Sequence, residues 1–141
     1  VEPFEFTTNC IDIWGYDLEK KECRVFKISR INSVVVLEDY WTNEDKHQKS
    51  KTDCFRMSSF EQTPVKVELS IRAKNLLLEE YPLAHADLKE IDGKWILDTM
   101  VSNMAGVGRF VIGLADEVKI IDSPALVEYI KAFVNSYLNK N

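Results

Sequence analysis

The spacing of apolar and polar residues in the C-terminal half of the chain predicts alternating strands and helices. "VKVELS" alternates as a half-buried strand does, and Ser70 is placed to cap a helix over residues 71–80. We expect this helix to end before Pro82, because the residue preceding a proline resists helical geometry. Asp92-Gly93 supplies the positive φ values of a two-residue turn, which predicts a hairpin between the next two strands.

The pattern continues with two further helices and a short strand. Asn103 is placed to cap a helix that Gly113 suits at its C-terminal end, "EVKII" predicts a strand, and Ser123-Pro124 opens the last helix. The order β-α-β-β-α-β-α predicts a ferredoxin-like βαββαβ domain, followed by an extra C-terminal helix. That helix has an apolar stripe that must be buried against its own sheet or another subunit. The stripe consists of Leu126, Tyr129, Ile130, Phe133, Val134, Tyr137 and Leu138.

Residues 1–41 have the composition of β-structure. β-Branched and aromatic residues recur in "FEFTT", "CIDIWGY", "CRVFKISRI" and "SVVVLEDY", which predicts four short strands. Several short strands with tight connections indicate a small barrel or a curled sheet. This block is too short to close a barrel by itself, and the chain does not begin with Met. We therefore expect an excised fragment that lacks earlier strands of the barrel.

Between these two regions the periodicity is lost. "TNEDKHQKSKTDC" is polar and rich in turn-forming residues, which predicts a linker over residues 42–63. Phe55, Met57 and Phe60 are placed to pin the end of this linker onto a neighbouring surface. The sequence thus predicts an α+β protein with a β domain at 1–41 and an α+β domain at 64–141.

Composition narrows the classes of function. No apolar run approaches the ~20 residues that a membrane span requires, and three scattered cysteines indicate reduced thiols, so we expect a cytoplasmic protein. The net charge of −5 argues against broad nucleic-acid binding. Neither His47 nor His85 has a nucleophile or ligand beside it in sequence, so we expect no enzyme, metal site or cofactor.

The third predicted strand is locally basic. If the chain is extended from residue 23 to 31, Arg24, Phe26 and Arg30 point to one face, and Lys27 points to the other. Arginine offers a planar fork of donors that fits phosphate and carboxylate oxygens. The alternative is that each arginine pairs with a local carboxylate of Glu22, Asp17 or Glu38. The spacing alone leaves both interpretations open.

Two regions of the sequence resemble a known family. "VEPFEF", the Tyr16-Asp17 pair and the basic strand with Arg24, Phe26, Lys27 and Arg30 resemble the second half of the WYL domain of bacterial transcriptional regulators. The region from 64 to 141, with "GRFVIGLADEVKIIDSP", looks like the C-terminal extension of that family, called WCX. Ile11-Asp12-Ile13 would align with the three residues that name the family, so the Trp and Tyr of that motif are absent.

The resemblance implies a fold and a function. The β domain would hold the later strands of an Sm-like barrel, and the chain would be the effector-sensing and dimer-forming part of a transcriptional regulator. The effector would be an anionic nucleotide or oligonucleotide held by Arg24, Lys27 and Arg30, with Phe26 or Tyr16 as the stacking surface. DNA would be bound only by an absent N-terminal helix-turn-helix. The alternative is a purely structural module that forms homodimers without a ligand.

Overall fold

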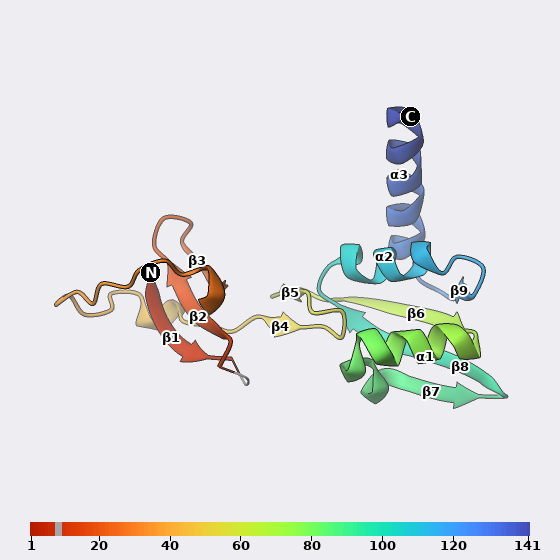
Figure 1. Ribbon diagram of the computed structural model, residues 1–141, viewed down its shortest axis with the longest axis horizontal. Coiled ribbons are helices and arrows are strands. Elements are labelled where there is room, and N and C mark those ends of the chain that lie inside the picture. Colours follow the sequence, from red (N-terminus) through yellow and green to blue (C-terminus); the bar gives the residue numbers. More distant parts are fainter. Residues whose placement is uncertain (8–9) are drawn as a thin grey trace. The chain divides into compact units, whose positions relative to one another are not determined.

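The computed structural model describes residues 1–7 and 10–141 as two compact units, Val1–Ser50 and Lys51–Asn141 (Figure 1). The predicted linker over residues 42–63 is divided between them, with 42–50 in the first unit and 51–63 in the second. No helix within the described ranges is both long and apolar enough to cross a membrane. The α+β class predicted from the sequence is confirmed.

The first unit is built on an antiparallel sheet with the strand order β1-β2-β3. Its strands are β1 (Glu2–Phe6), β2 (Asp12–Asp17) and β3 (Glu22–Lys27). Asp17 forms the turn between β2 and β3, because its Oδ1 accepts hydrogen bonds from the backbone N–H groups of Glu19 and Lys20, both at 3.1 Å. Three of the four predicted strands are therefore present; Thr8, the last residue of the first predicted one, lies outside the described residues.

The fourth predicted strand, over residues 33–40, does not form. The chain leaves β3 through a 3₁₀ turn, η1 (Ile28–Arg30), and has neither helix nor strand from residue 31 to 43. A second 3₁₀ turn, η2 (Glu44–Lys46), follows. A valine-rich sequence becomes a strand only where a neighbouring strand supplies its hydrogen bonds, and none of the described residues does so here.

Part of the predicted linker covers one face of this sheet. The ring of His47 stacks on Phe4 with centroids 4.7 Å apart and meets the edge of Trp41 at 4.9 Å. Its Nε2 lies 2.8 Å from Oε2 of Glu2, at the start of β1. These contacts make the segment up to Ser50 an integral part of the first unit.

The second unit contains a four-stranded antiparallel sheet with the order β7-β8-β6-β9. A two-stranded hairpin of β4 and β5 precedes it. The seven elements predicted after residue 63 are all present in the predicted order. The elements are β4 (Lys51–Thr52), β5 (Ser58–Ser59), β6 (Thr63–Leu69), α1 (Ile71–Glu80), η3 (Pro82–Asp87), β7 (Leu88–Ile91), β8 (Lys94–Val101), α2 (Met104–Gly113), β9 (Val118–Ile120) and α3 (Pro124–Lys140).

Local capping explains most of these boundaries. The side chains of Ser70 and Asn103 accept hydrogen bonds from N–H groups in the first turns of α1 and α2, as predicted. Asp92 and Gly93 have φ values of 52° and 74°, which confirms the hairpin turn between β7 and β8. Ser123 behaves differently: its Oγ accepts the N–H of Lys66 at 2.7 Å instead of capping α3. It thereby ties the start of α3 to β6.

The core of the second unit lies on one face of the sheet. Alternate residues of β6 and β8 point toward α1, α2 and the start of α3, and the opposite face carries exposed charges such as Lys66 and Asp98. Phe55, from the predicted linker, is 2% exposed and belongs to this core. The sheet contributes Val65, Val67, Leu69, Leu97 and Val101, and the helices contribute Ala73, Leu77, Val107, Phe110, Val111 and Leu126.

Candidate functional site

Two surfaces are candidates for function, one in each unit. The first is the basic strand β3. In the guanidinium group of Arg24, Nη1 lies 3.3 Å from Oδ2 of Asp17, and Nε lies 3.6 Å from Oε1 of Glu22. Arg24 is therefore paired with two of the carboxylates that the sequence offered as the alternative to a bound anion.

The pairing also affects Asp17. Hydrogen bonds from the backbone N–H groups of Lys20 and Glu19, together with Arg24, lower the pKa of the Asp17 carboxyl, and partial burial opposes them. Asp17 consequently stays ionised at neutral pH and keeps Arg24 neutralised. This arrangement stabilises the β2–β3 turn and gives Arg24 two carboxylate partners within the strand pair.

The predicted stacking residues lie on opposite sides of the sheet. Tyr16 pairs with Cys23 across the ladder, whereas Phe26 pairs with Ile13, so their side chains belong to different faces. The Tyr16 side is covered: Tyr16 is only 4% exposed, and the Nζ of Lys46 lies 5.8 Å from its ring centroid. Tyr16 is thus a packing residue of the first unit.

The remaining predicted cations lie at the end of β3. The strand ends at Lys27, and Arg30 belongs to η1, so the alternation that would place Arg30 beside Arg24 does not extend that far. Within the described ranges, neither Lys27 nor Arg30 takes part in an ion pair. The five predicted residues do not converge on one site. Residues 1–7 and 10–141 hold no cluster of three or more potential metal ligands.

A buried polar cluster surrounds Glu2, and no motif in the sequence predicts it. Its carboxylate accepts hydrogen bonds from the N–H of Thr42 at 2.8 Å and of Asn43 at 3.3 Å, and it also contacts His47. Burial would raise the pKa of Glu2, but these hydrogen bonds outweigh it and lower the pKa to about 2. The partners are at least 40 residues away in sequence, so no spacing rule could have found them. The cluster fastens β1 to the segment after residue 41.

The second candidate surface is the C-terminal half of α3. The first turns of this helix are packed: Leu126 is fully buried, and a Cβ on Gly108 of α2 would clash with the ring of Tyr129. The absent side chain at Gly108 therefore lets α2 and α3 approach closely. From residue 131 onward every residue of α3 is exposed, and Figure 1 shows this part of the helix extending beyond α2.

The exposed part of α3 is apolar along one stripe. Phe133 and Val134 are 49% and 39% exposed, and Tyr137 and Leu138 are 60% and 62% exposed. These four residues are the second half of the stripe predicted from the sequence. We call them the α3 stripe. The other half is buried or half-buried within the unit, so the intramolecular packing covers only part of the stripe.

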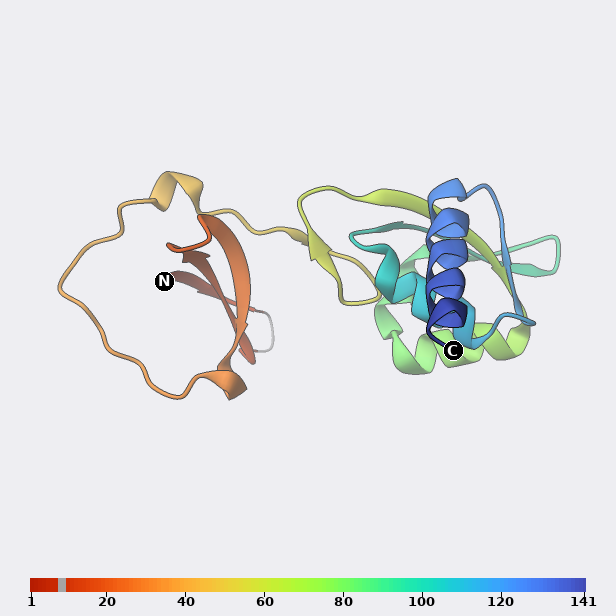
Figure 2. The same ribbon diagram turned by 90° about the horizontal axis from the view of Figure 1, so that it is seen from above.

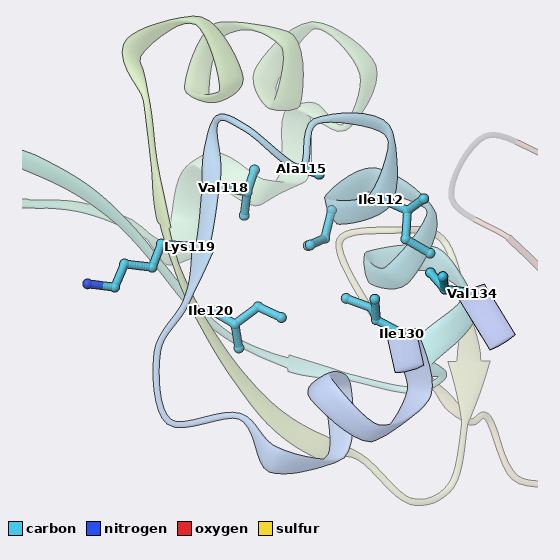
Figure 3. Close-up of a pocket in the computed structure, with 8 residues that line it drawn as sticks. Ile112, Ala115, Val118, Lys119, Ile120, Ile130 and Val134 are labelled. Atoms are coloured by element: carbon cyan, nitrogen blue, oxygen red, sulfur yellow. The ribbon is translucent and has the colours of Figure 1, made fainter. Parts of the chain in front are cut away.

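An apolar hollow of about 440 Å³ lies between α2, β9 and α3 (Figure 3). The ammonium group of Lys119 points away from the apolar side chains, so the lining side chains drawn in Figure 3 present an apolar surface to the hollow. β9 is an edge strand, which leaves this side of the unit open. Because Val134 belongs to both the hollow and the α3 stripe, the two form one continuous apolar surface. The lining consists of Val111, Ile112, Ala115, Val118, Lys119, Ile120, Ile130 and Val134.

Comparison of the chain with protein-family models, with curated proteins and with solved structures gives no match. The geometry of the two candidate surfaces and the sequence motifs are therefore the grounds for assigning a function. Of these surfaces, the one formed by the hollow and the α3 stripe is apolar and continuous.

Proposed function

We propose that this chain is the effector-sensing and dimerisation portion of a WYL-type transcriptional regulator, and that the α3 stripe carries the dimerisation. The sequence motifs of residues 1–31 and 64–141 support the family assignment. The strand order β9-β6-β8-β7, with α1 and α2 packed on the same core, supports a ferredoxin-like second unit. Under this proposal, β1, β2 and β3 are strands of an incomplete Sm-like barrel.

The exposure of the α3 stripe is the observation that carries the proposal. The last ten residues of α3 are all exposed, and a helical segment of that length is marginal in water without packing. Exposed aromatic and aliphatic side chains arranged on one stripe are typical of a surface that binds another helix or groove. A second copy offers both the same stripe and the same hollow, so each α3 can cover the other around a two-fold axis.

Sedimentation equilibrium of the full chain tests the dimerisation. We expect the unmodified protein to be dimeric and Phe133→Asp to be monomeric, because the new carboxylate would have to be buried without a partner. Asn135→Asp is the matched control: it adds the same charge to an exposed position of α3 outside the stripe and should leave the dimer intact. Circular dichroism confirms that both variants keep their helices. A monomeric unmodified protein at all concentrations would refute the proposal.

The proposed effector site contains fewer residues than the sequence predicted. Lys27 and Arg30 lack ion-pair partners in the described part of the chain and are exposed at the end of β3, whereas Arg24 is neutralised. An anionic nucleotide or oligonucleotide would act by differential affinity for two arrangements of the dimer. The alternative, a structural module without a ligand, shares the dimer and lacks this binding.

Titration with short single-stranded oligonucleotides and with cyclic nucleotides tests the effector site. We expect Lys27→Ala combined with Arg30→Ala to abolish binding, and Arg24→Ala to change it little. Lys20→Ala is the control, because it removes an exposed cation at the other end of β3. Unchanged binding by the double variant would show that the site is wrong, and no binding by the unmodified protein would favour the structural module.

A further inference from the structure

The segment between η1 and η2 exposes an apolar run. Val34, Val35, Val36 and Leu37 are 74%, 79%, 90% and 68% exposed. Among the described residues, the backbone of residues 32–41 takes part in no backbone–backbone hydrogen bond. Figure 2 shows the segment as a wide arc that leaves the sheet after β3 and returns at η2. Both its side chains and its backbone groups are therefore available to another chain.

The residue types in this run favour one kind of partner. β-Branched side chains prefer strand geometry, and an unpaired strand-forming segment offers its N–H and C=O groups to a second strand. Strand addition of this kind derives affinity from backbone hydrogen bonds and specificity from alternate side chains. A partner that is itself an extended apolar segment fits this run.

The charges that flank the run identify the partner. Arg30 precedes the run, and Glu38 and Asp39 follow it; in the described part of the chain none of the three takes part in an ion pair. Antiparallel pairing of two identical copies always places the N-terminal flank of one opposite the C-terminal flank of the other. If the pairing is centred on Val34, Arg30 lies opposite Glu38 twice. Parallel pairing would place like charges side by side.

We propose that residues 31–37 pair with the same residues of a second copy of this chain as antiparallel strands. The register centred on Val34 also places Ile31 of each copy opposite Leu37 of the other, so apolar side chains meet on both sides of Val34. This contact belongs to the first unit and is separate from the α3 stripe in the second. Because Arg30 is also a candidate anion ligand, a bound anion would compete with Glu38 of the second copy.

Hydrogen–deuterium exchange of the full chain tests the pairing residue by residue. We expect the amides of residues 32–37 to be protected at high protein concentration and to exchange freely at low concentration. Two short strands form a weak pair on their own, so the concentration series must reach the millimolar range. The same series in the Phe133→Asp background separates the two contacts, since the pairing does not depend on α3. Free exchange at every concentration would overturn the proposal, as would protection that is independent of concentration.

Charge reversal at Arg30 and Glu38 is the decisive experiment. Arg30→Glu and Glu38→Arg each place like charges opposite each other, so each variant alone should lose the protection. A mixture of the two variants restores both opposite-charge pairs in the heterodimer, and we expect protection to return there. Lys20→Glu is the control with the same charge change away from the segment, and it should behave as the unmodified protein does. A mixture that exchanges as fast as either variant alone would refute the proposal.

Discussion

Asp53 is expected to be the most sensitive polar residue of the second unit. Its Oδ1 accepts hydrogen bonds from the N–H groups of Phe55 at 2.9 Å and Met57 at 3.0 Å, and its Oδ2 accepts the N–H of Ser102 at 2.7 Å. Asp53 itself is 4% exposed. It therefore holds the turn that inserts Phe55 into the core and ties this turn to the end of β8.

The cost of removing the carboxylate follows from these three bonds. A hydrogen bond to a charged group contributes about 1.5–3 kcal/mol, and a buried N–H left without an acceptor costs about as much. Water can reach Met57 and Ser102 more easily than the buried Phe55 N–H, so we expect Asp53→Ala to destabilise the unit by about 3–5 kcal/mol. Asp53→Asn retains one carbonyl oxygen and should cost about 2 kcal/mol.

Urea unfolding followed by far-ultraviolet circular dichroism measures this effect. The signal reports the second unit, because all three described α-helices belong to it. Asp116→Ala is the control: Asp116 is exposed and, in the described part of the chain, unpaired, so its loss should change the free energy of unfolding by less than about 0.5 kcal/mol. A loss below about 1 kcal/mol for Asp53→Ala would refute the reasoning.

Three further predictions concern other parts of the chain. The carboxylate form of Glu2 is stabilised by folding, so its contribution to the stability of the first unit should be lost as the pH falls from 4.5 through about 2. Glu2→Gln should flatten that dependence, as followed by the NMR signals of β1; an unchanged pH profile would contradict the assignment. Gly108→Ala should destabilise the second unit by about 1–3 kcal/mol in urea unfolding through its clash with α3, whereas Gly113→Ala, with open space around it, should not. Cys10 should react quickly with a thiol reagent and Cys54 only on unfolding, because burial raises the pKa of Cys54 to about 11; equal rates would be inconsistent with the structure.

Features that depend on residues close together in the chain were predicted correctly, and features that depend on distant residues were not. Ser70, Asn103 and the Asp92-Gly93 turn were predicted correctly, because a cap or a turn is decided by residues within about four positions of each other. The strand predicted over residues 33–40 was wrong, because strand formation requires a partner that the local sequence does not contain.

The candidate site on β3 also combines features that the local sequence predicted with features that it could not predict. Strand alternation correctly separated Lys27 from Arg24 and Phe26, but it could not reveal that the strand ends before Arg30 or that Asp17 and Glu22 hold Arg24. The polar composition of residues 42–63 predicted a linker, although His47 within it is a packing residue of the first unit. Phe55 packs in the core of the second unit, which agrees with the prediction that it pins the end of the linker.

The sequence by itself determined the α+β class, the order of elements after residue 63, the helix ends and the existence of an apolar stripe on α3. These features depend on local hydrogen bonding and on the period of apolar residues, and both are determined by residues close together in the chain. Only the tertiary structure decided which half of the stripe is covered, which acids neutralise Arg24, and that Glu2 and Asp53 anchor the segment between the two sheets. Burial and the Glu2 and Asp53 hydrogen bonds join residues far apart in the chain, and the choice of partners for Arg24 depends on how β2 and β3 pair, so all of these are settled only when the elements pack.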